Sequence, residues 1–258
     1  MPTLKDSAVV LRLVDWSESS QIAVVLTREH GKIRAVAKGV RKTASRKAGH
    51  LELFMRSRLL LARGRNLDII TQAELIEPYM ALRDDLWRVT YACYAAEMLD
   101  QFTPDEEAHI ELYDLLNDAL GWIGEEEDLD RLMRWYELCL LDQVGFRPQL
   151  YDCVRCHESL LPERNYFSIV EGGVVCPRCQ HNHVESSAGG LVTLELTPFK
   201  VLRYFQTHEY DACRGIGISR RTHRELERLM HRYIAYHLER QLKSTEFLRL
   251  LRTQGMRE

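Results

Sequence analysis

The sequence predicts an α+β protein with several domains: a small β-barrel first, then an all-helical body that one cysteine-bearing insertion interrupts. Apolar runs rich in β-branched residues fill the first 77 residues, the apolar period becomes helical from Leu82, and two close cysteine pairs lie between residues 153 and 179. These three observations place the barrel in residues 1–80, the helical body in residues 81–150 and 184–258, and the insertion in residues 151–183.

Strand-like runs come first along the chain. They cover residues 7–14, 21–27, 32–38, 51–62 and 67–76, and turn-like stretches such as DWSESS, REHG and ARGRN separate them. Short strands within fewer than 80 residues suit a small barrel, because closure of the sheet removes its exposed edges. We expect an OB-fold barrel, with an SH3-like barrel as the alternative.

The helical body opens where Asp84 or Asp85 can cap a helix that runs to about Gln101. The next stretch, Thr103-Pro104-Asp105-Glu106, has the pattern of a capping box with proline at the first helical position, and it predicts the start of a second helix. Later helices are expected to begin near Leu129, at Thr197-Pro198, and at Thr222 with Glu225.

Charge is segregated along the chain, although the net charge is only −3. Residues 1–80 carry 14 basic and 8 acidic side chains, whereas residues 81–152 carry 5 basic and 18 acidic ones. This asymmetry predicts a polyanion-binding end on an acidic body. The sequence contains no apolar run of ~18 residues and no signal-peptide pattern, and its cysteines suit a reducing compartment, so a cytoplasmic protein without a membrane role is expected.

The basic excess is greatest in residues 31–49, which contain seven lysines and arginines and no acidic residue. A strand over residues 32–38 would carry its charges on one face, and a loop of small residues continues them into a ribbon that suits a phosphate backbone. Only Trp16 and Phe54 are aromatic before Pro78, so the contact should be mainly ionic; a merely solvated face is the alternative. The candidate phosphate-binding residues are Lys32, Arg34, Lys38, Arg41, Lys42, Arg46 and Lys47, and the ribbon extends to Arg56, Arg58, Arg63 and Arg65.

The two cysteine pairs form a C-x₂-C … C-x₂-C pattern with nineteen residues between the pairs. Four thiolates from two such knuckles complete a tetrahedral zinc shell and leave no position for a catalytic water, so one structural Zn²⁺ is expected. The segment between the knuckles predicts a hairpin that turns at Gly172-Gly173. A degenerate site without metal, a redox CxxC pair, or a histidine in place of one cysteine are the alternatives. The ligand candidates are Cys153, Cys156, Cys176 and Cys179, with His157, His181 or His183 as substitutes.

A second group of arginines is spaced along the last long predicted helix. Arg221, Arg224 and Arg228 fall on one helical face, where they form either a solvated surface or a dock for an acidic partner. The sequence has no GxxxxGK[ST] loop, no HExxH, no GxSxG and no spaced carboxylate cluster. We therefore predict no catalytic residue and no enzymatic activity.

Several longer stretches of the chain point to a known family. They are the strand run AVVLRLVDWSESSQIAVVLTREHGKIRAVAKGVRK, the helical runs YACYAAEMLDQF and LYDLLNDAL, and the cysteine-bearing runs LLDQVGFRPQLYDCVRC and GGVVCPRC. Together these stretches extend over nearly the whole chain. They resemble the first strands, the first two body helices and the zinc module of one bacterial family, the RecO recombination mediators and DNA repair proteins.

The resemblance implies an OB-fold that binds single- and double-stranded DNA and a protein that anneals complementary strands without nucleotide hydrolysis. It also implies contact with the acidic tail of single-stranded DNA-binding protein, and joint action with RecR to load RecA at gaps, in the cytoplasm at the nucleoid. The DNA role maps onto the seven basic residues of the 31–49 run, and the acidic-tail dock onto the helical body, with Arg221, Arg224 and Arg228 as candidates.

Two other functions are open at this point. One is a zinc-stabilised adaptor or regulator that binds proteins and has only incidental DNA affinity. The other is a nucleic-acid enzyme such as a nuclease, which would need a clustered carboxylate or histidine site in the fold. Salt-sensitive binding to DNA would separate the mediator from the adaptor, because phosphate contacts release counterions.

Overall fold

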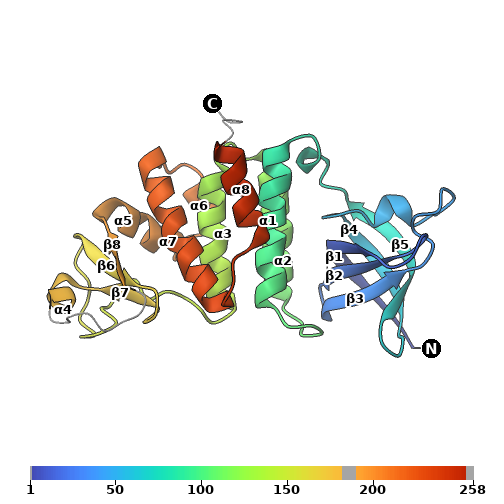
Figure 1. Ribbon diagram of the computed structural model, residues 1–258, viewed down its shortest axis with the longest axis horizontal. Coiled ribbons are helices and arrows are strands. Elements are labelled where there is room, and N and C mark those ends of the chain that lie inside the picture. The colour runs from blue at the N-terminus through green and yellow to red at the C-terminus, as the bar shows by residue number, and fades with distance from the viewer. Residues whose placement is uncertain (1, 182–189, 254–258) are drawn as a thin grey trace. The chain divides into compact units, whose positions relative to one another are not determined.

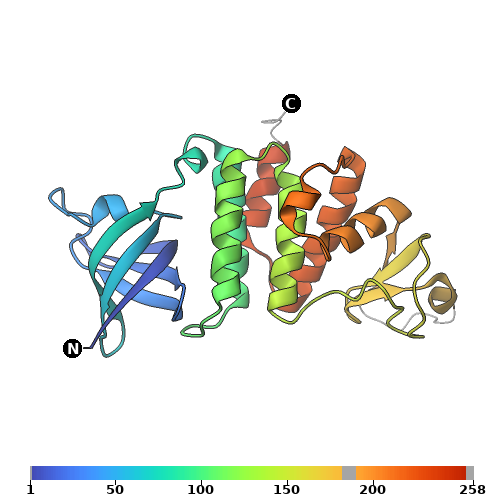
Figure 2. The ribbon, with the colours of Figure 1, turned by 180° about the vertical axis from the view of Figure 1, so that it is seen from behind.

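The computed structural model describes residues 2–181 and 190–253 (Figure 1). Two compact units divide the chain: residues 1–126 with residues 246–258, here called unit 1, and residues 127–245, here called unit 2. Figure 2 shows the same elements from behind. Among the described residues, no helix combines the length and the apolar character that crossing a membrane requires. The domain limits given above from the sequence stay a prediction.

A closed barrel forms the N-terminal part of unit 1, with strand order β1-β2-β3-β5-β4 (Figure 1). β4 closes the sheet because it pairs antiparallel with β1, and β3 pairs parallel with β5. This closure confirms the predicted OB-like barrel and sets aside the SH3-like alternative. The strands are β1 Thr3–Asp15, β2 Gln21–Thr27, β3 Gly31–Ala37, β4 Arg56–Ala62 and β5 Asp68–Glu77, and the short 3-10 helix η1 Ala48–His50 precedes β4.

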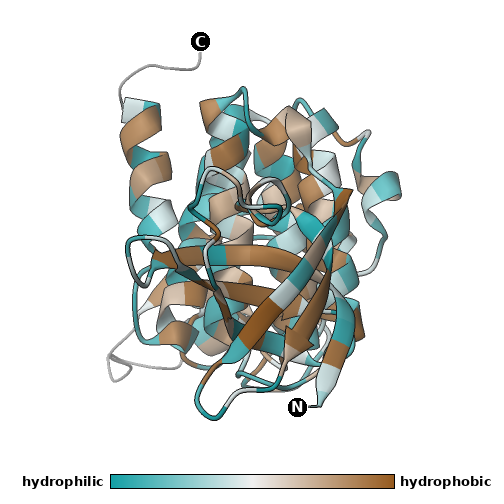
Figure 3. Cartoon of the chain, turned by 90° about the vertical axis from the view of Figure 1, so that its right-hand side faces the viewer, coloured by the Kyte–Doolittle hydropathy of each residue, from teal (hydrophilic) through white to brown (hydrophobic). Residues whose placement is uncertain are grey.

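The barrel interior is built by alternation along the strands. Ile33, Ala35 and Ala37 of β3 are buried in one apolar cluster with Ala23 and Val25 of β2. Figure 3 shows the strands as mainly hydrophobic and the loops between them as mainly hydrophilic. Because side chains of a strand alternate between its two faces, positions 32, 34 and 36 of β3 lie on the outer face of the barrel.

α1 Leu86–Phe102 begins where the sequence predicts it. The Asp85 carboxylate accepts hydrogen bonds from the backbone N–H groups of Trp87 (2.7 Å) and Arg88 (3.1 Å), which satisfies donors that have no partner inside the helix. A 3-10 turn, η2 Met80–Leu82, separates the helix from the barrel, and α2 Ile110–Glu125 packs beside α1.

The prediction that Thr103-Pro104-Asp105-Glu106 starts a helix is wrong. The Thr103 hydroxyl instead donates to the carbonyl four residues earlier (2.8 Å) and closes the end of α1. The chain then runs beside β3, where Asp105 forms a bridge with Lys32 and the Glu106 N–H donates to the Lys32 carbonyl (2.9 Å). Pairing with the barrel therefore overrides the local capping pattern, and α2 begins only at residue 110.

Unit 2 contains α3, which packs against α5, α6 and α7. Asp128 caps α3 by accepting the Arg131 N–H (2.9 Å), as its position before an apolar stripe suggests. Ser219 caps α7 by accepting the Thr222 N–H (3.2 Å), so the helix begins before Thr222, the start expected from the sequence. These helices of unit 2 are α3 Leu129–Gln143, α5 Leu196–Phe205, α6 Tyr210–Cys213 and α7 Arg220–Leu238. The last helix, α8 Lys243–Thr253, belongs mostly to unit 1.

The insertion contains a three-stranded antiparallel sheet of order β7-β6-β8 and a short helix, α4 Pro177–His181. β6 Asn165–Ser168 and β7 Gly173–Val175 form the predicted hairpin, whereas β8 Leu191–Leu194 is a strand that the sequence pattern does not predict. Gly172 adopts a φ of +72° in the turn, and a Cβ atom on Gly173 would lie 2.6 Å from the Gln149 carbonyl oxygen. The positive φ therefore favours glycine at position 172, and the close contact requires it at position 173.

Candidate metal centre and nucleic-acid interface

Two separate segments bring the four cysteines together. Cys153 and Cys156 lie on the turn before β6, Cys176 directly follows β7, and Cys179 lies in α4. Their four Sγ atoms lie within 4.8 Å of one another. The Val154 N–H donates to a carbonyl of β7 (3.0 Å), which holds the first knuckle against the strand that leads into the second.

The sulfur distances fit a tetrahedral metal centre. The Cys156 and Cys176 Sγ atoms are 3.8 Å apart, and all four thiols are free. A disulfide would join two sulfurs at about 2.05 Å, whereas Zn–S bonds of about 2.3 Å set the sulfurs of a tetrahedron about 3.8 Å apart. The contact also joins the two CxxC pairs, which a shared metal requires and two separate redox pairs do not. The donor set and its spacing therefore fit one zinc ion.

Backbone groups favour the thiolate form at Cys153. Burial raises the pKa of this thiol, but backbone N–H groups of Cys156, Cys176 and Arg155 point at the sulfur and lower the pKa more strongly. The resulting pKa of Cys153 is about 6. The Cys176 N–H group is 3.4 Å from the Cys153 Sγ atom. Burial and the neighbouring thiols raise the pKa of Cys176, and they raise that of Cys179 to about 12.

The histidines near the cluster do not add a ligand in the described part of the chain. The cluster of metal-ligating side chains found there consists of the four cysteines. His157 takes a left-handed conformation (φ 59°), and its N–H donates to the Cys153 carbonyl (2.9 Å), so it closes the knuckle by its backbone. The side chain of His181 and the whole of His183 lie outside the described residues.

Lys32 is an exception among the predicted basic surface residues, and the expectation that it faces solvent is wrong. Its side chain is buried, with a residue exposure of 7%. The Nζ atom donates to the backbone carbonyls of Asp100 (2.7 Å) and Thr103 (2.8 Å), and it lies 3.0 Å from the Asp100 carboxylate and 3.4 Å from that of Asp105. The connection from α1 to α2 covers this end of β3, so Lys32 links the barrel to the C-terminal end of α1, where the helix dipole favours a cation.

The loop after β3, residues 38–47, is fixed to the barrel at several points. Val40 is buried in the barrel core. The Gly39 N–H donates to the Ser20 Oγ atom (3.1 Å), and the Arg41 N–H donates to the Ser19 carbonyl (3.1 Å). The basic loop is therefore hydrogen-bonded to the turn between β1 and β2, residues 16–20.

The predicted cations of β3 and this loop differ in whether their charged groups already have a partner. The Arg41 guanidinium pairs with Asp15 (3.0 Å), and the Lys47 Nζ atom donates to the Ile70 carbonyl (2.9 Å), with burial lowering the Lys47 pKa. The other predicted cations are exposed and have no ionic partner within the described residues. They are Arg34, Lys38, Lys42 and Arg46.

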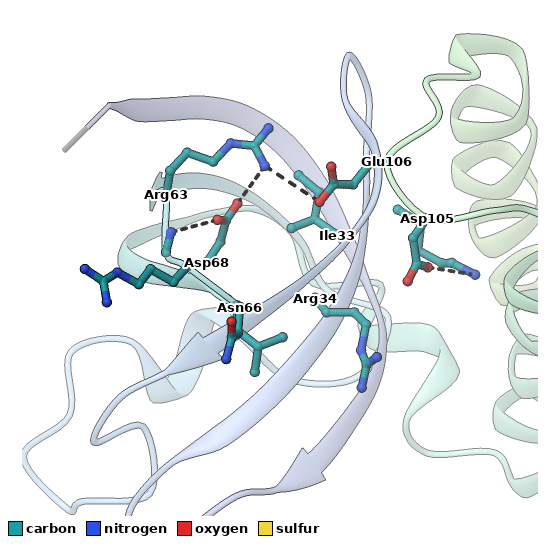
Figure 4. A pocket seen from close by; sticks show the side chains of 11 residues that line it. Ile33, Arg34, Arg63, Asn66, Asp68, Asp105 and Glu106 are labelled. Atoms are coloured by element: carbon teal, nitrogen blue, oxygen red, sulfur yellow. Dashed lines mark hydrogen bonds and ion pairs between the residues drawn. The ribbon is translucent and has the colours of Figure 1, made fainter.

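A polar cavity of about 240 Å³ lies between β3, the β4–β5 loop and the α1–α2 loop. Arg63 lies there between the carboxylates of Asp68 (3.2 Å) and Glu106 (3.9 Å), as Figure 4 shows. The Arg34 side chain points away from both carboxylates (Figure 4). The charge of Arg63 is thus already matched by acids, whereas Arg34 and Arg65, which also line the cavity, have no ionic partner within the described residues.

The three predicted arginines of α7 are exposed in unit 2. Arg221 pairs with Glu225 (2.8 Å), four residues further along the helix. The Nε atoms of Arg224 and Arg228 each donate to the carbonyl four residues earlier (3.2 Å), and within the described residues neither has an acidic partner. The structure therefore places two unpaired guanidinium groups on this face.

The sequence predicts a mainly ionic contact, with Trp16 and Phe54 as the aromatic residues before Pro78. Phe54 is buried, in a left-handed conformation (φ 65°). Trp16, in contrast, is 61% exposed, and it lies in the turn to which the basic loop is bonded. The position of Trp16 in the polar stretch DWSESS is the sequence feature that indicates its exposure. Only the tertiary structure shows that Trp16 lies near the basic loop.

Comparison with known proteins connects both units to one family. Residues 1–79 match the family model described as "Recombination protein O N terminal", and residues 83–246 match "Recombination protein O C terminal". The chain belongs to the RecO family. The DNA repair protein RecO of Roseiflexus sp. (strain RS-1) is 38% identical over 255 residues, which is 97% of this chain and 88% of the relative. RecO of Symbiobacterium thermophilum is 35% identical over 248 residues, 95% of this chain and 96% of the relative.

Membership of the RecO family confirms the resemblance seen in the sequence and supports a role in DNA repair and recombination. RecO of Pelotomaculum thermopropionicum, 38% identical over 251 residues, covers 96% of this chain and gives the same result. The two RecO models meet between residues 79 and 83, just after β5, so the N-terminal model corresponds to the barrel.

Proposed function

We propose that this RecO-family protein binds single- and double-stranded DNA through the basic surface of its barrel, without reading base sequence. The observation that carries the proposal is the set of four exposed cations on β3 and its loop, each without an ionic partner in the described part of the chain: Arg34, Lys38, Lys42 and Arg46. Exposed cations without an ionic partner are free to displace counterions from phosphates.

The same surface supports annealing of complementary strands without ATP. Cations that contact the phosphate backbone reduce the repulsion between two strands and leave the base edges free to pair. No group of this mechanism needs to break or form a covalent bond, so the proposed protein is a mediator rather than an enzyme. We expect it to act in the cytoplasm at the nucleoid, where its DNA lies.

We further propose that Cys153, Cys156, Cys176 and Cys179 hold one structural Zn²⁺. The ion would supply the cross-link that fixes the two knuckles, and the short strands of the insertion supply little apolar core of their own. Four sulfur ligands fill the shell, so the proposed ion serves structure and not catalysis.

The proposed protein partners are RecR, RecA through RecR, and the acidic tail of single-stranded DNA-binding protein. For the acidic tail, support comes from the unpaired guanidinium groups of Arg224 and Arg228, beside the paired Arg221. Binding of that tail would bring the protein to coated DNA at a high effective concentration.

Replacing Lys38, Lys42 and Arg46 by alanine together is expected to weaken binding to every DNA sequence by a similar factor. Loss of three phosphate contacts should also make the slope of log K against log salt shallower by about 2 on single strands. Fluorescence anisotropy with labelled oligonucleotides at a series of salt concentrations measures both quantities.

The matched control keeps the charges at the same positions, as Lys38→Arg, Lys42→Arg and Arg46→Lys, and should keep both the affinity and the slope.

The proposed annealing is measured on complementary strands coated with single-stranded DNA-binding protein, without ATP. Unchanged affinity and slope in the alanine variant would show that the loop does not bind DNA, and salt-insensitive binding by the natural protein would favour the adaptor function.

The double substitution Arg224→Ala with Arg228→Ala is expected to weaken binding of a peptide copied from the acidic tail by about 2- to 30-fold, the range for two exposed charge pairs. Isothermal titration calorimetry measures the change. Arg147→Ala is the control, because Arg147 is an exposed arginine of the same unit that already pairs with Asp142 (2.9 Å). Equal affinity for the double variant and the natural protein would place the dock elsewhere.

A further inference from the structure

We propose that Trp16 stacks on an unpaired base of a single strand whose phosphates lie on the basic loop, and that this contact makes the barrel prefer single-stranded to double-stranded DNA. The inference rests on the proposed DNA binding and adds to it the residue that recognises an unpaired base.

The first observation is the exposure of the indole. Trp16 is 61% exposed, whereas Trp87 and Trp135 are buried. No side-chain hydrogen bond or ring contact holds the Trp16 indole within the described residues. A large apolar ring in water is unfavourable unless a ligand covers it, because its burial would release the water that surrounds it.

The second observation is that a fixed backbone presents this ring. The Trp16 N–H donates to the Ser20 carbonyl (3.0 Å), and Ser17 and Ser20 bond each other through their backbones (3.1 Å from the Ser17 N–H to the Ser20 carbonyl and 3.3 Å for the reverse bond). The turn between β1 and β2 is therefore closed on itself. A ring held by a closed turn loses less conformational entropy when it binds a base than a ring on an open loop.

The third observation is that the turn and the basic loop leave the barrel at the same edge. Gln21 at the start of β2 pairs with Asp15 at the end of β1 and with Ala37 at the end of β3, so Trp16 and Lys38 follow the ends of the two strands that flank β2. The Asp15 carboxylate holds the two segments together, since it accepts from the Gln21 side chain (3.0 Å) and from the Arg41 guanidinium (3.0 Å). Aromatic and cationic groups thus share one surface.

The outer face of the sheet beside this edge offers little apolar surface of its own. Val14 is 42% exposed, but Ile22 and Val36, which follow it across the sheet, are only 7% and 9% exposed. The next outward position of β3 is the exposed Arg34. A base that reaches this edge would therefore find its apolar contact on the Trp16 indole, while its phosphates contact the cations.

A base offers its face to a side chain only when it is not stacked between its neighbours in a duplex. Stacking on one base is worth about a 5- to 150-fold change in affinity on single strands and does not depend on salt. The phosphate contacts, in contrast, are available on either form of DNA and weaken with salt. Trp16 would therefore supply discrimination that the basic loop lacks.

The test compares the natural protein with Trp16→Ala on oligothymidine and on a duplex of the same length, across a salt series. The variant should lose about 5- to 150-fold in affinity for the single strand, keep the salt slope, and keep its affinity for the duplex. Trp16→Phe retains an aromatic face and should retain most of the affinity.

A second probe removes the bases instead of the indole. The natural protein should bind an abasic strand of equal length as weakly as Trp16→Ala binds oligothymidine. The natural protein and Trp16→Ala should bind the abasic strand with equal affinity. If the natural protein binds neither oligothymidine nor the duplex, the proposed function fails. If Trp16→Ala and Trp16→Phe both bind oligothymidine with the affinity of the natural protein, only the role of Trp16 is overturned.

Discussion

Replacing Cys153 by serine is expected to abolish binding of the proposed zinc ion and to unfold the insertion. A structural zinc site contributes on the order of 10–16 kcal/mol in small zinc-finger peptides, and the insertion has only the short strands β6, β7 and β8 to hold it otherwise. Cys153 is the buried member of the four, and its sulfur receives the Cys176 N–H (3.4 Å). Its loss removes one ligand and one contact between the knuckles.

Two measurements follow this change: zinc per chain by plasma mass spectrometry, and hydrogen exchange over residues 150–180. Zinc should fall far below one per chain and exchange protection in β6 and β7 should disappear, whereas protection in β1–β5 should stay, because the barrel belongs to unit 1. Treatment of the natural protein with a strong chelator should reproduce the result.

Cys93→Ser is the matched control for the zinc prediction. Cys93 is a half-buried thiol of α1, burial raises its pKa, and it lies outside the cluster. This variant should keep one zinc per chain. Native exchange protection in a zinc-free Cys153→Ser protein would show that the insertion folds without metal, and would contradict the structural role.

Replacing Lys32 by methionine is expected to destabilise unit 1 by about 3–5 kcal/mol, the cost of leaving one partner of a buried ion pair alone. Methionine has a similar length but cannot donate to the Asp100 and Thr103 carbonyls. Among the described residues, the Asp100 carboxylate would keep only the more distant Arg12 (3.7 Å) as an ionic partner. Urea denaturation followed by circular dichroism gives the change in the free energy of unfolding.

Arg34→Met is the control for Lys32→Met, because it makes the same change two residues along the same strand. Arg34 is exposed, so its loss should change the free energy of unfolding by less than about 0.5 kcal/mol but should weaken DNA binding. The two variants therefore give opposite results on stability and on binding. Equal stability of Lys32→Met and the natural protein would show that the link between β3 and α1 contributes nothing.

Much of the fold could be predicted because it depends on local patterns. The alternation of residues 32–38 predicts a strand with Ile33, Ala35 and Ala37 inward, and the barrel core contains them. Asp85 and Asp128 cap α1 and α3 because a carboxylate before an apolar helical stripe satisfies free N–H groups wherever it occurs. The two cysteine pairs predict their own cluster, because each knuckle brings two thiols together by local geometry alone.

The sequence by itself thus determined the strands of the barrel, the helices α1, α3, α5 and α7 and the two cysteine knuckles, since each depends on residues close together in the chain. Only the tertiary structure decided that Thr103–Glu106 pairs with β3 rather than starting a helix, and that Lys32 is buried beneath that segment. It also decided that Trp16 lies beside the basic loop. These features depend on contacts between distant segments, and a local pattern of charge or capping cannot show which surface another part of the chain will cover.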